Sequence, residues 1–114
     1  MFEIDKKTNN CKLTRGDTLY LDVAAYEDEE LTILHHLVEG DKMFFRLAGA
    51  GAYIEKEIPI NLETNLGLLT LVPSDTKPLD FITYKYEIEL VTVLDEHFTF
   101  IANKNFKIDE ELQR

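Results

Sequence analysis

The chain has 114 residues, with 22 acidic and 12 basic side chains, a formal net charge of −10 and 45% apolar residues. This length predicts one domain over residues 1–114, and its apolar runs are shorter than the roughly 20 residues of a membrane-spanning helix, so we expect no membrane insertion. The negative charge repels a phosphate backbone, so we expect no binding to nucleic acid.

The N-terminal quarter predicts one clear strand. Residues 2–4 are compatible with a short edge strand, residues 8–11 with a polar loop, and residues 13–18 with a turn. Residues 18–25 then alternate between apolar and polar positions, which is typical of a half-buried strand. The residues predicted to face inward are Leu19, Leu21, Val23 and Ala25.

The middle of the chain predicts three further strands between loops. The acidic segment 27–30 predicts a solvated loop, and residues 31–38 show neither strand nor helix periodicity. Glycines break the chain at 48–51, and Pro59 ends the next alternating segment, because proline cannot donate to a strand ladder. The predicted strands are 42–47, with Met43, Phe45 and Leu47 inward, 53–58, and the nearly continuous apolar run 66–72.

The longest alternating pattern lies in the last third of the chain. Residues 73–80 predict a crossover with one short helical turn, capped by Ser74 or Asp75. Residues 82–94 predict a long strand, and a turn at 95–97 leads to an antiparallel return strand that residues 103–108 extend. The inward face of the long strand is predicted to carry Ile82, Tyr84, Tyr86, Ile88 and Leu90.

These elements predict an all-β fold. About seven strands with frequent turn signals and no helical crossovers favour an Ig-like Greek-key β-sandwich, and a small closed β-barrel is the alternative. We expect the core to contain Leu19, Leu21, Val23, Tyr84, Tyr86, Ile88, Leu90, Phe98 and Phe100.

No residue pattern predicts an active site. His35 and His36 are adjacent and would point to opposite faces of a strand, so they do not share a metal easily. Cys11 has no visible activating partner. We therefore expect no enzyme activity, no catalytic residue, no cofactor and no metal site. Calcium binding by the acidic segment 27–30 together with Glu39 and Asp41, which lack EF-hand spacing, stays an open alternative.

Four short motifs carry a family resemblance. They are Gly16-Asp17-Thr18 before a strand, Pro73-Ser74-Asp75-Thr76 in a turn, Tyr84-Lys85-Tyr86-Glu87-Ile88-Glu89-Leu90 in a strand, and Phe98-Thr99-Phe100 in the strand after it. Their order resembles small Ig-like structural proteins of tailed phages and prophages of Gram-positive hosts, in particular the N-terminal domain of phage baseplate upper proteins. The chain departs from that family at Phe81-Ile82, where a glycine is usual, and at Glu87, where an aspartate is usual.

The resemblance implies a non-enzymatic assembly protein that docks into a phage tail or baseplate. Its partners would be other phage or prophage structural proteins, including further copies of itself, in the virion or the host cytoplasm; the N-terminal residues show no signal-peptide pattern. The alternative function is a β-sandwich binding module of a cell-surface or carbohydrate-binding system. Aromatic residues on the faces opposite the predicted core are interface candidates, with burial in the core as the other interpretation: Tyr20, Tyr26, Phe44 and Tyr53.

Overall fold

The computed structural model describes residues 1–110, which form nine strands and one short helix. The helix, α1, spans Pro73–Thr76, and no helix formed by these residues has the length and apolarity to cross a membrane. The strands are β1 (Phe2–Ile4), β2 (Cys11–Thr14), β3 (Leu19–Val23), β4 (Lys42–Gly49), β5 (Ala52–Ile58), β6 (Ile60–Asn61), β7 (Leu66–Leu71), β8 (Thr83–Val91) and β9 (His97–Asp109).

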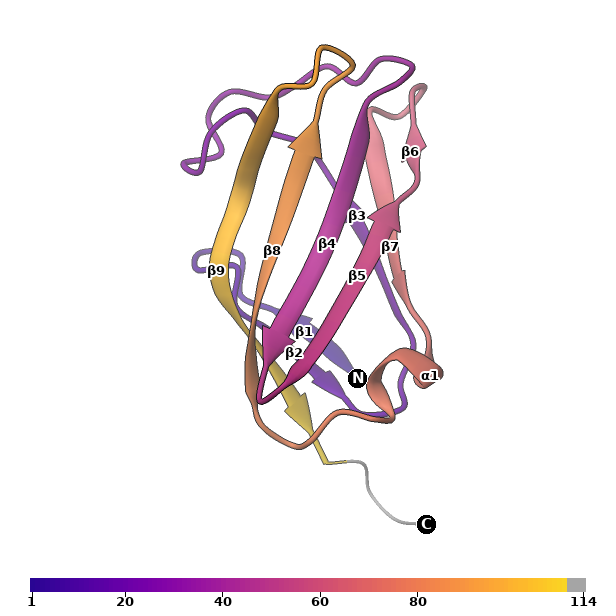
Figure 1. Cartoon of the computed structure of the whole chain (residues 1–114), viewed down its shortest axis with the longest axis vertical. Helices are drawn as coiled ribbons and strands as arrows, with labels where there is room; N and C mark the ends of the chain where they lie inside the picture. The colour runs from indigo at the N-terminus through magenta and orange to yellow at the C-terminus, as the bar shows by residue number, and fades with distance from the viewer. Residues whose placement is uncertain (111–114) are drawn as a thin grey trace.

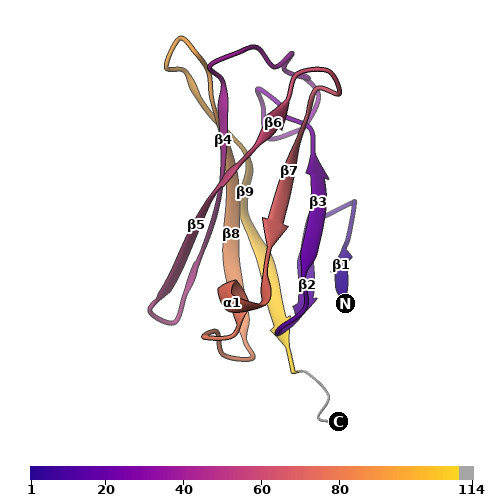
Figure 2. The same cartoon turned by 90° about the vertical axis from the view of Figure 1, so that its right-hand side faces the viewer.

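The strands form two sheets that face each other across one apolar core (Figures 1 and 2). The larger sheet has the order β1-β2-β9-β8-β4-β5, and the smaller sheet has the order β3-β7-β6. Neighbouring strands are antiparallel except for β2 and β9, which run parallel. Because the sheets remain separate, the closed barrel considered as an alternative is wrong.

The predicted alternation is confirmed in the strands that build the core. On β4, Met43, Phe45 and Leu47 are at most 1% exposed, because successive side chains of a strand alternate between the core and the solvent. Leu21 and Phe98 are only half-buried at the margin of the core. The other members of the predicted core are buried: Leu19, Val23, Tyr84, Tyr86, Ile88, Leu90 and Phe100.

Two predictions about strand boundaries are wrong. Residues 1–110 form nine strands rather than about seven, because β2 lies in a segment expected to be loop and turn, and β6 was not expected at all. Strands of two to four residues carry too little alternation to be recognised. Ile82 is 38% exposed and not in the core: β8 begins one residue later, and the Ile82 N–H donates to the Asp80 carbonyl in a turn.

An aromatic cluster fills the half of the sandwich that β2 closes. The Phe106 ring on β9 lies 5.7 Å from Tyr86, 6.0 Å from Phe45 and 6.4 Å from Phe2, measured between ring centroids. The Cys11 thiol on β2 donates to the Tyr86 hydroxyl at 3.4 Å. Edge-to-face and tilted ring pairs contribute about 0.5–1.5 kcal/mol each beyond their buried area. This cluster therefore anchors β1 and β2 to the rest of the large sheet.

The predicted helical turn is confirmed, but its N-cap is Val72 rather than Ser74 or Asp75, and Asp75 lies at the third helical position. The Asp75 carboxylate accepts the Val72 N–H at 2.8 Å, so it satisfies a donor at the start of the turn. The hydroxyl of Thr76 accepts the Gly16 N–H at 3.1 Å, from the turn that precedes β3. Two of the motifs that carry the family resemblance, 16–18 and 73–76, therefore meet in space, 60 residues apart along the chain.

Candidate functional site

Three connections meet at one end of the sandwich, which we call the loop end: residues 24–41 between β3 and β4, 62–65 between β6 and β7, and 92–96 between β8 and β9 (Figure 1). Large apolar side chains are exposed there, with Leu94 the most exposed at 78%. Exposed apolar groups gathered in one region are typical of a surface that contacts another molecule. The residues are Ile33, Leu34, Val38, Leu62, Val93 and Leu94.

The buried carboxylate of Asp41 joins two of these loops. Its side chain is fully buried, and its two oxygens accept the Val38 N–H and the Val93 N–H, both at 2.9 Å. One of these oxygens also lies 2.8 Å from His35 Nε2. A buried charge is stable only when it is paired and hydrogen-bonded, and Asp41 meets both conditions. The carboxylate therefore fixes residues 92–96 against residues 24–41.

The side chain of Asn65 joins the third loop to the first. Its Oδ1 accepts the Leu37 N–H at 2.7 Å, and its Nδ2 donates to the His35 carbonyl at 3.2 Å. Asn65 has a φ of 59°, a left-handed conformation that asparagine tolerates better than most residues. All three loops are thus connected through one hydrogen-bonded network centred on His35, Asp41 and Asn65.

His35 lies between two carboxylates within this network. Its Nδ1 is 2.7 Å from Glu27, and its Nε2 is 2.8 Å from Asp41. Burial lowers the pKa of His35, but the hydrogen bonds to Glu27 and Asp41 outweigh it, so the net pKa lies above the ordinary value of 6.5. Burial raises the pKa of Asp41, but hydrogen bonds from the Val38 N–H and from His35 lower it below the ordinary value of 3.8. Each group therefore favours the charged form of the other.

Two side chains of the acidic segment 27–30, Glu27 and Asp28, form hydrogen bonds within the loop 24–41. Asp28 accepts the backbone N–H groups of Thr32 and Ile33, each at 3.0 Å, and the Thr32 hydroxyl. These hydrogen bonds, led by the Thr32 hydroxyl and the Ile33 N–H, lower the pKa of Asp28. Glu27 is bound to His35. Within residues 1–110, no three His, Cys, Asp or Glu side chains are arranged to hold a metal ion.

Three of the predicted interface aromatics lie on the two outer faces of the sandwich. Tyr20 is 70% exposed on β3 of the small sheet, whereas Tyr53 is 62% exposed on β5 of the large sheet. Phe44 on β4 is half-buried, with the Arg46 guanidinium 5.4 Å from its ring centroid. Because the two exposed tyrosines lie on different sheets, they do not form one aromatic platform for a flat ligand such as a sugar.

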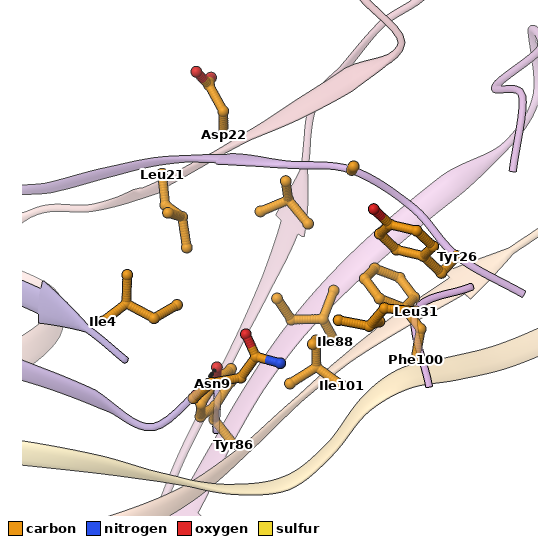
Figure 3. A pocket seen from close by; sticks show the side chains of 12 residues that line it. Ile4, Asn9, Leu21, Asp22, Tyr26, Leu31, Tyr86, Ile88, Phe100 and Ile101 are labelled. Carbon is orange, nitrogen blue, oxygen red and sulfur yellow. Dashed lines mark hydrogen bonds between the residues drawn. The ribbon is translucent and has the colours of Figure 1, made fainter. Parts of the chain in front are cut away.

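The expectation that Tyr26 faces outward is wrong. Its half-buried ring lies 6.2 Å from the Phe100 ring, and it lines an apolar pocket of about 160 Å³ between β3 and β9 (Figure 3). Strand β3 ends at Val23, so the alternation does not continue to position 26. The pocket is also lined by Leu21, Ile88 and Ile101.

Sequence reasoning missed Asp41 and Asn65 as the residues that join the loops. Asp41 follows Gly40 at the end of its loop, and aspartate commonly binds nearby backbone N–H groups in turns. Its bond to the Val93 N–H, however, spans 52 residues of sequence, and no local pattern marks such a contact. Asn65 likewise reaches across 28 residues to Leu37. His35, expected to be partly buried or at the surface, is partly buried, and His36 is exposed.

Cys11 is poorly placed for chemistry. Burial of the thiol raises its pKa to about 11, although the hydrogen bond with Tyr86 opposes this shift. A thiol with that pKa stays protonated near neutral pH, and the protonated form is a poor nucleophile.

Comparison with known proteins assigns no role to the residues of this site. No protein-family model, curated protein or solved structure matches the chain.

Proposed function

We propose that this chain is a non-enzymatic interaction module with an Ig-like Greek-key fold, which acts as a structural or assembly protein of a tailed phage or prophage. In this proposal it works in the virion, or in the host cytoplasm during assembly. The loop end docks onto another structural protein of the same particle. The observation that carries the proposal is the hydrogen-bonded fixation of three loops that expose apolar side chains.

Two observations support the Ig-like form of the sandwich. The order β9-β8-β4-β5 opposite β3-β7-β6, with two hairpins in the large sheet, is the arrangement of such domains. The Tyr84 hydroxyl near the start of β8 accepts the Asp80 N–H at 2.9 Å. A tyrosine that binds the backbone a few residues upstream, at the corner between the two sheets, is a recurrent feature of Ig-like domains.

The assignment to phages rests on the resemblance of the sequence motifs. Thr76 binds the Gly16 N–H, and Asp75 binds the Val72 N–H at the start of α1, so these motif residues have structural roles of the kind that the resemblance implies. Tyr84 and Tyr86, from the strand motif, are at most 4% exposed. The motifs are thus a folding signature, and the contacts with partners must lie elsewhere on the surface.

The loop end is suited to such contacts because it is organised before binding. Ordering loops on association costs free energy, about 0.5–1.5 kcal/mol for each immobilised flexible side chain. Asp41 and Asn65 already hold the three loops, so this cost is reduced. Exposed Leu94 and Ile33 offer apolar area to a partner, and burial of apolar surface is the main driving force of protein association.

The proposal can be tested with particles from the strain that encodes the chain. Prophage induction followed by density-gradient purification should yield tailed particles that contain the protein, as measured by quantitative mass spectrometry. Replacing Leu94 with aspartate should reduce its incorporation by about tenfold or more, because a charge would have to be buried in the contact.

The control for this experiment is Leu68→Asp. Leu68 is 44% exposed on β7, on the outer face of the small sheet, so this variant makes the same chemical change away from the loop end. We expect its incorporation to match that of the wild type. The proposal is wrong if no particle contains the protein, or if Leu94→Asp is incorporated as well as Leu68→Asp.

A further inference from the structure

The sandwich is open along one seam, where two strand edges have no strand partner among residues 1–110. Strand β3 pairs with β7 alone. Strand β9 pairs with β8 along most of its length, but β2 covers its other edge only at Phe106–Asp109. We propose that this seam, between β3 and the upper half of β9 (residues 97–105), binds an extended peptide segment of another protein as an added strand.

A pocket of about 160 Å³ at the seam would receive an apolar side chain of that segment. Figure 3 shows Leu21 from β3, Tyr26 and Leu31 from the following loop, and Phe100 and Ile101 from β9 around one space. An apolar cavity of about 150 Å³ in a protein core is large enough to bind benzene. The pocket therefore has room for one aliphatic or aromatic side chain.

A bulge in β9 forms the floor of this pocket. The register between β8 and β9 shifts on both sides of Ile88, and Asn103 has a φ of 54°. A bulge gives two residues of one strand to a single partner position, so successive side chains no longer alternate strictly. Phe100 and Ile101 are accordingly both buried, at 2% and 7% exposure. The seam thus offers apolar surface beside a backbone edge that lacks a strand partner among residues 1–110. At the lower end of this edge, the Asn105 N–H donates to Asn10 Oδ1 at 3.0 Å.

The charges beside the pocket select the chemistry of the segment. A second opening, which shares Asn9, Leu31 and Phe100 with the first as lining residues, is also lined by three lysines and two glutamates. None of these three lysines forms an ion pair with another side chain of residues 1–110, although the chain carries a net charge of −10. The glutamates are Glu29 and Glu30, and the lysines are Lys6, Lys7 and Lys104.

Because side chains alternate along a strand, one added strand could contact both openings. An added strand would point alternate side chains into the apolar pocket and the intervening ones toward solvent and the lysines. The segment that fits is therefore one that alternates apolar and acidic residues. Backbone hydrogen bonds to the edge would supply affinity, while the pocket and the lysines would supply specificity. This site uses other residues than the exposed apolar set of the loop end, so the two proposals can fail separately.

The test uses the whole chain and two synthetic peptides. The first is acetyl-Ser-Glu-Ile-Glu-Ile-Glu-Val-Ser-amide, and the second has lysine at each glutamate. Titrations followed by backbone amide shifts in nuclear magnetic resonance should show saturable changes for the acidic peptide at residues 97–104 and in β3. We expect the acidic peptide to bind about tenfold more tightly than the basic one, with a difference that shrinks as salt is added.

Two variants and a matched control complete the test. Lys104→Glu should weaken binding of the acidic peptide by about fivefold, because it reverses a charge beside the edge. Ala24→Leu should abolish binding by filling the pocket that Ala24 lines. Lys42→Glu, at an exposed position at the start of β4, should leave the affinity unchanged. If Ala24→Leu fails to fold, the affinities of Lys104→Glu and Lys42→Glu for the acidic peptide still test the proposal.

The proposal is overturned by any of three results. The acidic peptide gives no saturable shifts at the seam, or both peptides bind equally well. Alternatively, Lys104→Glu binds the acidic peptide as tightly as Lys42→Glu does.

Discussion

The two halves of strand β9 are held in different ways. Its lower half, Phe106–Asp109, has a strand on each side and carries Phe106 in a cluster of aromatic rings. Its upper half has β8 on one side and an open seam on the other, and it leads to loops that Asp41 and Asn65 fasten by hydrogen bonds. One strand thus passes from a region stabilised by apolar contacts to one stabilised by charged and polar groups.

The half of the sandwich that contributes most to stability is therefore distinct from the half that carries the proposed interaction surfaces. The aromatic half, which contains β2 and Phe106–Asp109 of β9, is stabilised by rings buried between the sheets, and such rings contribute mainly to the free energy of unfolding. The polar half exposes apolar loop residues and an open pocket, which cost stability unless something covers them. Both proposed interaction surfaces lie in the polar half, where local openings of the structure are expected to cost less.

The largest expected loss of stability comes from truncating one phenylalanine in each half of β9. Phe106→Ala removes a ring that contacts three others and should lower the free energy of unfolding by about 3–5 kcal/mol. Phe100 contacts one ring and borders the open pocket, so Phe100→Ala should cost at least about 1 kcal/mol less. Urea unfolding followed by circular dichroism measures both values.

Each variant serves as the control for the other, since both phenylalanines are at most 2% exposed. Burial alone would predict equal losses. Equal urea midpoints for Phe106→Ala and Phe100→Ala would therefore contradict the expected difference and show that the two halves of β9 are equally well packed.

A smaller loss of stability is expected from Asp41→Asn in the polar half, which contains residues 97–105 of β9 and the three loops of the loop end. The amide keeps one acceptor oxygen but presents an NH₂ group to one of two backbone donors, Val38 N–H or Val93 N–H. An unsatisfied buried donor costs about 1–3 kcal/mol. Amide hydrogen exchange should quicken at Val93 while that of the β2–β9 ladder changes little.

The control for this variant is Asp22→Asn, at an exposed position on β3. We expect its urea midpoint to equal that of the wild type. A loss of exchange protection spread evenly over both halves after Asp41→Asn would contradict the view that the loop network acts locally.

The sequence was sufficient to predict the aromatic half only in part. Period-2 alternation identified Tyr84 and Tyr86 as core, because strand geometry turns every second side chain inward. It did not identify β2, whose four residues pair with the far end of the chain. That pairing depends on contacts across about the whole length of the chain, and local patterns carry no information on them.

The polar half was harder to predict for a different reason. Asp41 and Asn65 are residue types that are common in turns, so their presence in the sequence does not mark them as residues that join distant loops. Their function comes from distant backbone groups, Leu37 and Val93. Tyr26 was misplaced because the alternation was continued beyond the end of β3.

The smallest expected effect is a dependence of stability on pH that is confined to the polar half. The folded pKa of His35 is raised by Glu27 and Asp41, so its contribution is complete below the ordinary value of 6.5 and is lost as the pH rises through the folded pKa. The folded pKa of Asp41 is lowered, so its contribution is present above 3.8 and is lost as the pH falls through the folded value. The loop end should thus be most stable between these limits. Raising the pH from 6 to 9 should cost about 1 kcal/mol or less, as for other partly exposed ion pairs.

Two histidine variants distinguish this network from other titrating groups. His97, which is exposed beside Glu89 and Asp95, also has a raised pKa because of hydrogen bonds to these two acids. Urea unfolding from pH 6 to 9 should therefore show the decline in wild type and in His97→Gln, but not in His35→Gln. A decline that survives in His35→Gln and disappears in His97→Gln would place the titration on the outer face of the large sheet. The polar network would then hold the loops with an uncharged imidazole, and the contrast between the two halves would be one of geometry rather than of charge.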